Sequence, residues 1–176
     1  DTMIGVIGTA PKGEGVLTIT PGSHGGNMDC NKIKAGTTLY LPANVPGALL
    51  SMGDLHARMG DGEVLICGLE TAGVVTVRVS VLKGKEHQPL FAALPLLHAK
   101  DRLMTIQSGK TMDEAAVLAA GKMQQLVKAV CGLTDEDSGM LMSLLGDLVI
   151  CQIVNPLKTV RCEFPVSVLE GYRKNR

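Results

Sequence analysis

Aromatic side chains are almost absent from this sequence, whose 176 residues include no Trp, two Tyr and two Phe. Proteins that bind single-stranded nucleic acid stack bases on such side chains, so their scarcity argues against that function. An excess of charge of either sign is also lacking, because 17 Lys and Arg residues balance 17 Asp and Glu residues. A balanced charge provides no electrostatic footprint for nucleic acid or an anionic membrane. We therefore expect a small, uncharged ligand, or one that a few local groups bind.

Long apolar runs and paired cysteine motifs are lacking too. No apolar stretch approaches the roughly 20 residues that a helix needs to cross a bilayer, and we expect no signal peptide. The five cysteines are odd in number and include no CxxC pair, which disfavours a disulfide framework or a thiolate zinc site. Cys67, Cys131 and Cys151 lie in apolar runs, where a reduced thiol behaves as a small hydrophobic side chain. Scattered free thiols indicate a cytoplasmic protein.

The hydrophobic content of 45% is sufficient for one compact unit over residues 1–176. Residues 1–85 are rich in glycine and in aliphatic runs, which predicts a strand-rich part. The clearest strand is Val74–Leu82, where valines alternate with polar residues and so indicate one buried face. The predicted strands are Met3–Ile7, Gly15–Thr20, Thr38–Leu41, Val64–Leu69 and Val74–Leu82.

A looser segment, 85–110, precedes a helical pair at 111–155. Thr111 and Glu114 form a capping box that begins the first helix, and Gly132 ends it. Thr134 begins the second helix, whose predicted buried stripe is Met140/Leu141, Leu144/Leu145 and Leu148. A returning strand at 159–168 and a basic, frayed tail at 171–176 complete the chain. Since strands and helices do not alternate regularly, the fold class is α+β.

Residues of the types that bind metals concentrate between Pro21 and Glu70. Imidazole and carboxylate are the ligands that catalytic zinc and related divalent metals use. The loop His24–Asp29 contains two adjacent glycines and can fold tightly enough for its polar side chains to converge. The i, i+2 spacing of Asp54 and His56 places both on one face of a strand. The sequence thus predicts a metal-dependent hydrolytic site drawn from His24, Asn27, Asp29, Asp54, His56, Asp61, Glu63 and Glu70.

Several of these residues also have a simpler structural interpretation. Asp61 precedes Gly62 and is as compatible with a hairpin turn as with a ligand. His24 could brace the glycine loop, and Glu70 is either a buried acid or an edge residue facing solvent. We interpret His87 and His98, which lie in the looser segment outside the motifs that pair a histidine with carboxylates, as structural.

Two long motifs, PGSHGGNMD and GDLHARMGDGEV, resemble the acetamidase/formamidase family. The runs GLETAGVVTVRV, TIQSGKTMDEAAVLA and SLLGDLVICQIVNPLKTVRCEFP are similar to that family as well, so the resemblance covers nearly the whole chain. It implies a soluble cytoplasmic hydrolase that cleaves the C–N bond of formamide, acetamide or similar short amides to ammonia and a carboxylate. It also implies a β/α/β layered fold, a homo-oligomer and a bound divalent metal, zinc or calcium.

The resemblance places the family's polar positions at Asn27, Asp29, Asp54, His56 and Glu63. We expect the cation at His56 with Asp29 or Asp54, and Glu63 as general base and then acid. Asn27 and the backbone amides of Gly25 and Gly26 would hold the developing oxyanion. The expected groups are catalytic Glu63, Asn27 and His56; metal ligands Asp29, Asp54, His56 and His24; and substrate-binding Gly25, Gly26 and Glu70.

Family chains are longer, with a β-rich N-terminal region before the strand at Met3–Ile7. The chain therefore resembles the C-terminal part of a family member, and we expect three partners: a small amide, further copies of the chain, and that N-terminal part. An inactive binding or structural fragment is one alternative. A metal-free amidase that uses Glu63 is another.

Overall fold

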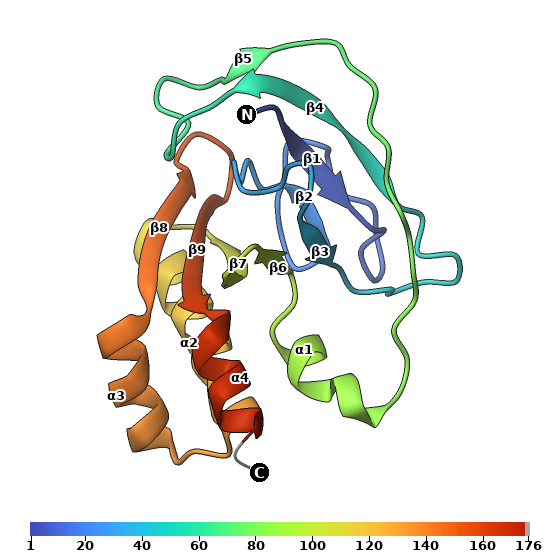
Figure 1. Ribbon diagram of the computed structural model, residues 1–176. Helices are drawn as coiled ribbons and strands as arrows, with labels where there is room; N and C mark the ends of the chain where they lie inside the picture. Colours follow the sequence, from blue (N-terminus) through green and yellow to red (C-terminus); the bar gives the residue numbers. More distant parts are fainter. Residues whose placement is uncertain (175–176) are drawn as a thin grey trace.

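Two antiparallel sheets organise the computed structural model, which describes residues 1–174 (Figure 1). The first, sheet A, contains β1 (Met3–Gly8), β2 (Gly25–Asn27), β4 (Ser51–Arg58) and β5 (Leu69–Glu70). The second, sheet B, contains β3 (Thr38–Tyr40), β6 (Leu96–Ala99), β7 (Arg102–Gly109), β8 (Asp147–Gln152) and β9 (Lys158–Pro165). The strand orders are β2-β1-β4-β5 and β3-β6-β7-β9-β8.

The helices lie mostly in the second half of the chain. They are η1 (Lys85–His87), a short 3₁₀ helix, and the α-helices α1 (Gln88–Ala92), α2 (Met112–Cys131), α3 (Asp135–Leu145) and α4 (Val166–Lys174). The N-caps confirm the predicted helix starts: the Thr111 hydroxyl accepts from Glu114 N (3.1 Å) and the Thr134 hydroxyl from Asp137 N (3.1 Å). Gly132 ends α2 in the left-handed conformation, with φ 66°. Within residues 1–174, no helix has the length and apolar character needed to cross a membrane.

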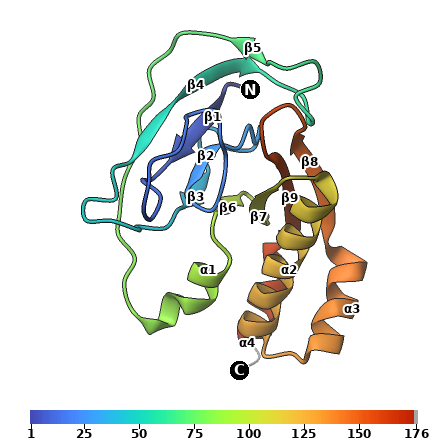
Figure 2. The same cartoon turned by 180° about the vertical axis from the view of Figure 1, so that it is seen from behind.

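Sheet B is the middle layer, because each of its faces contributes to a different hydrophobic core. Leu103 of β7 packs with α2 in one core, whereas its neighbour Met104 packs with Ile7 of β1 in the other. Figures 1 and 2 show α2 against sheet B on the side away from sheet A. The α+β class is thereby confirmed, and the layers among the described residues run sheet, sheet, helix.

The strand predictions are confirmed only in part. Met3–Ile7 and Thr38–Leu41 correspond to β1 and β3. Gly15–Thr20 forms a loop, and only the last residue of Val64–Leu69 belongs to a strand. Val74–Leu82 was predicted wrongly: it is extended but pairs with no strand among residues 1–174, and Val74 is 96% exposed. Alternation indicates which side chains a strand would bury, but a strand forms only where a neighbour accepts its backbone hydrogen bonds.

Several further predictions, most of them C-terminal, need correction. The pair at 111–155 contains β8, because α3 ends at Leu145. The predicted stripe of α3 is largely exposed, with Leu144 78% accessible. The returning strand ends at Pro165, and Gly171–Lys174 of the expected tail lies in α4, while residues 175–176 fall outside the described part. The looser segment 85–110 holds β6 and β7, and Cys67 is exposed, although Cys131 and Cys151 are buried as expected.

Candidate active site

Strand β4 supplies the centre of the site. His56 is fully buried, and its Nε2 atom lies 3.2 Å from Asp54 Oδ1 and 3.2 Å from Glu70 Oε1. Asp54 reaches His56 because residues two apart on a strand share a face, as the spacing predicted. Glu70 reaches it from the neighbouring strand, since β5 pairs with β4 at His56↔Glu70.

Two loops bring buried carboxylates to the same imidazole. Asp29 follows β2, and its backbone N–H donates to Gly5 O (3.2 Å). Glu63 lies in the loop between β4 and β5 and is 5% exposed. Asp29, His56 and Glu63 each place one ligand atom within 4.8 Å of the others, and Asp54, His56 and Glu70 form a second such group around the same imidazole.

The first group fits a divalent cation. Asp29 Oδ1, His56 Nδ1 and Glu63 Oε2 are all buried without a hydrogen-bond partner, which is an unfavourable arrangement unless a ligand satisfies some of them. One imidazole and two carboxylates also match the donor set of catalytic zinc sites. Gly5 keeps this space open: a Cβ there would overlap Asp54 Oδ2 and lie 2.6 Å from Asp29 Oδ1.

The crowding of carboxylates shifts their protonation. Burial, followed by the charge of Asp29, raises the pKa of Glu63 to about 8. Burial also raises the pKa of Asp29, although a hydrogen bond from Asn155 opposes the shift. Burial likewise raises the pKa of Glu70, although the charge of His56 opposes that shift. Without a cation Glu63 therefore retains its proton at neutral pH, which a bound cation would displace.

Comparison with known proteins identifies the family. The family description "Acetamidase/Formamidase family" matches residues 3–129 of this chain. The chain belongs to the acetamidase/formamidase family. It is 37% identical over 108 residues to a formamidase of Methylophilus methylotrophus, covering 58% of this chain and 26% of that protein. It is 40% identical over 72 residues to an acetamidase of Mycolicibacterium smegmatis, covering 40% of this chain and 18% of that protein.

Solved structures of acetamidases share the fold. The acetamidase from Bacillus halodurans superposes with a TM-score of 0.91 at 50% identity, covering 97% of this chain and 56% of that chain. The acetamidase from Yersinia enterocolitica gives a TM-score of 0.82 at 27% identity, covering 96% of this chain and 49% of that chain. The chain thus spans about half the length of these structures and a smaller share of the curated relatives.

Two asparagines hold the acidic residues of this acetamidase/formamidase site in place. The hydrogen-bond network assigns the Asn27 amide with its nitrogen toward the carboxylates, 3.0 Å from Asp29 Oδ2 and 3.2 Å from Asp54 Oδ2. Asn155, in the turn between β8 and β9, donates to Asp29 Oδ2 (2.7 Å) and to Asn27 O (3.0 Å). Sequence reasoning assigned Asn155 only to the end of a helix. The one available signal was its place in the family-like run SLLGDLVICQIVNPLKTVRCEFP, because 126 residues separate it from Asp29.

Replacing Asn155 tests this support. In Asn155→Ala, the buried Asp29 carboxylate loses a short charge-assisted hydrogen bond, so we expect the free energy of unfolding to fall by about 1–3 kcal/mol. Urea denaturation followed by circular dichroism measures the change. Asn44→Ala is the matched control, because Asn44 donates an exposed hydrogen bond to a backbone oxygen, Ala10 O (3.1 Å), instead of to a buried carboxylate. Equal stability losses in the two variants would contradict the assignment.

His24 and the two glycines after it do not join the cluster. β1 pairs with β4 at Met3↔His56 but with β2 at Gly8↔Gly25, so five residues of strand, or about 17 Å, separate the two positions. The N–H of Gly25 already donates to Gly22 O (3.0 Å) and is unavailable to an oxyanion. The sequence placed these residues in the site because a short loop appeared able to fold back, whereas residues 25–27 extend as β2 instead.

A pocket of about 340 Å³ opens beside Glu63, large enough for a short amide. Its lining comprises Arg58, Met59, Gly60, Asp61, Glu63, Val64, Cys67, Gly68 and Leu69. His87 and His98 lie on η1 and β6 and belong to neither ligand group among the described residues. Asp61 is also in neither group, and its hydrogen-bond partners are Arg161 and Asn31.

Proposed function

We propose that this chain carries a metal-assisted amidase site that hydrolyses the C–N bond of short aliphatic amides such as formamide and acetamide. The observation that carries the proposal is the convergence of one ligand atom each from Asp29, His56 and Glu63, three buried residues that each also keep a polar atom without a hydrogen-bond partner, with Glu63 lining a small pocket. The names of the relatives, formamidase and acetamidase, support the substrate class.

Asp29, His56 and Glu63 would hold the cation, with Asp54 and Glu70 next to the same imidazole. A divalent cation bound there would act as a Lewis acid toward the amide carbonyl oxygen. The imidazole nitrogen favours zinc over calcium, which prefers a shell of oxygens.

Glu63 is the proposed proton carrier. It lines the pocket, where its carboxylate can take a proton from the attacking water. As the oxygen of water bonds to the amide carbon, Glu63 takes one proton from the water. It returns that proton to the nitrogen as the C–N bond breaks, so that ammonia and the carboxylic acid leave. Asn27 keeps Asp29 and Asp54 oriented, because its amide nitrogen faces both carboxylates.

Removing the metal tests the proposal. We expect ammonia release from formamide and acetamide to stop after treatment with a chelator such as 1,10-phenanthroline and to return when Zn²⁺ is added back. An ammonia assay on dialysed protein measures this. If the rate is unchanged in protein shown by elemental analysis to be metal-free, the metal role is excluded and the metal-free amidase that uses Glu63 gains support.

A second candidate function is metal and amide binding without turnover. It is favoured by the ligand groups themselves, because convergent ligand atoms beside a pocket suffice for binding a cation and a small amide. Calorimetric titration with Zn²⁺ separates the two candidates. Saturable Zn²⁺ binding without ammonia release would support a binding module, whereas both together support the amidase.

A further inference from the structure

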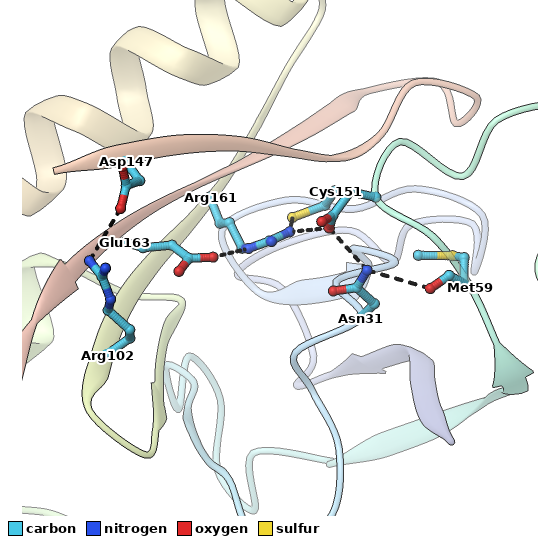
Figure 3. A network of polar contacts seen from close by, with 8 residues as sticks. Asn31, Met59, Arg102, Asp147, Cys151, Arg161 and Glu163 are labelled. Atoms are coloured by element: carbon cyan, nitrogen blue, oxygen red, sulfur yellow. Dashed lines mark hydrogen bonds and ion pairs between the residues drawn. The ribbon is translucent and has the colours of Figure 1, made fainter. Parts of the chain in front are cut away.

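Asp61 lies next to the ligand-bearing part of its loop, and its partners are Arg161 of sheet B and Asn31 of the segment that follows β2. Its Oδ1 atom accepts hydrogen bonds from Arg161 Nη1 (2.7 Å) and from Asn31 Nδ2 (3.0 Å). Figure 3 shows the contacts running from Glu163 through Arg161 to Asn31. The loop is therefore connected to β9, a strand inside sheet B, between β7 and β8.

Arg161 is a rigid partner. It is 1% exposed, and its Nε atom donates to Glu163 Oε1 (2.7 Å). Its neighbours Val160 and Cys162 pack with α2. The side chain of Arg161 therefore extends from the opposite face of β9, toward sheet A. Burial alone would lower the pKa of Arg161, but the hydrogen bonds to Asp61 and Glu163 raise it, and the guanidinium stays charged.

The loop that Asp61 anchors has an unfavourable backbone conformation. Gly62 has φ 95° and Glu63 has φ 44°, in the left-handed region that costs a non-glycine residue about 1 kcal/mol or more. Backbone contacts to sheet B hold it as well: Gly62 N donates to Cys151 O (3.0 Å) and Ile153 N donates to Gly62 O (3.2 Å). Such a conformation persists only while its surroundings hold it.

Asp61 thus connects both ligand-bearing segments to Arg161. It lies two residues before Glu63, and it accepts a hydrogen bond from Asn31, which lies two residues after Asp29. We propose that Arg161 and Asp61 are positioning residues, which set the separation of the Asp29 and Glu63 carboxylates without touching the ligand. The inference rests on the proposed metal site, but the position of the loop can be measured without metal.

Asp61→Ala is the decisive variant, because Asp61 is partly exposed and its removal leaves the buried Arg161–Glu163 pair intact. We expect Zn²⁺ affinity, measured by calorimetric titration, to fall about 10–100-fold, the range for residues that orient metal ligands. We also expect faster amide hydrogen exchange at Gly62 and Glu63 in the metal-free protein, measured by NMR. Asp61→Asn keeps the acceptor oxygen, so it should recover most of the Zn²⁺ affinity and most of the protection from exchange.

The matched control is Asp147→Ala. Asp147 pairs with Arg102 of β7 (Nη1 to Oδ2, 3.2 Å), an exposed ion pair on the same sheet that touches neither ligand-bearing segment (Figure 3). This variant should leave both readouts at wild-type values. Two results for Asp61→Ala would overturn the positioning role. One is hydrogen exchange at Gly62 and Glu63 at the wild-type rate, and the other is faster exchange with unchanged Zn²⁺ affinity. If the wild type itself binds no Zn²⁺, the proposed function fails, and the exchange rates alone decide whether Asp61 positions the loop.

Discussion

The Glu63→Gln variant is expected to lose amide hydrolysis by about 10²–10⁴-fold, the contribution typical of a general acid–base group. Glutamine keeps the size and polarity of the side chain but neither accepts nor returns a proton. Because it also replaces a ligand atom, Zn²⁺ affinity should fall with the rate. Steady-state ammonia release and calorimetric titration measure the two effects separately. The control Glu86→Gln, at an exposed position on η1, should behave as the wild type.

In the metal-free protein, the same substitution is expected to reduce the loss of stability that accompanies a rise in pH. The pKa of Glu63 rises from 4.5 to about 8 on folding, so between these pH values the folded state holds a proton that the unfolded state has released. The contribution of this group therefore decreases as pH rises from about 4.5 to about 8. Glutamine resembles the protonated form, and metal-free Glu63→Gln should show a smaller loss of stability over that range than the wild type in urea denaturation. Parallel profiles of stability against pH for the variant and the wild type would show that Glu63 titrates as an ordinary exposed acid. Full amide hydrolysis by the variant would remove Glu63 from the mechanism.

The Gly5→Ala variant is expected to abolish most Zn²⁺ binding while leaving the fold intact. Its Cβ would overlap Asp54 Oδ2 and lie 2.6 Å from Asp29 Oδ1, so both carboxylates must turn away from the cation position. Carboxylate ends move easily, and alanine is not less favourable than glycine in a strand, so β1 should still form. We expect Zn²⁺ affinity to fall at least about 100-fold, the upper part of the range for disturbed ligand orientation.

Gly53→Ala is the control for this variant, because Gly53 lies on the adjacent strand β4 and no atom lies within 4 Å of its Cβ position. Calorimetric titration of both variants, with circular dichroism melting curves, separates loss of the site from loss of the fold. Wild-type Zn²⁺ affinity in Gly5→Ala would show that Asp29 and Asp54 do not surround the cation.

Features that depend on a few neighbouring residues could be predicted from the sequence. Helix α2 is an example, since Thr111, Glu114 and Gly132 act on backbone groups within one turn of themselves. The pairing of Asp54 with His56 is another, because the spacing of two residues on a strand indicates a shared face.

Features that depend on distant partners could not be predicted in this way. The valines of 74–82 alternate as in a paired strand, yet no strand among residues 1–174 pairs with them. Asn155 and Arg161 reach the site region from β8–β9, and the contact of Arg161 with Asp61 spans 100 residues. His24 was misplaced for the converse reason: nearness in sequence to Asp29 does not imply nearness in space when β2 extends between them.

The contacts of Gly62 with Cys151 and of Asp29 with Asn155 place the candidate site at the seam between the two sheets. A ligand bound there is thermodynamically linked to the docking of the two sheets, since undocking removes the contacts from sheet B that hold the Asp29 and Glu63 segments in place. At a concentration 100 times its dissociation constant, such a ligand adds about 2.7 kcal/mol to the stability of the docked state. The cation would then stabilise the packing of sheet A on sheet B as well as the site itself.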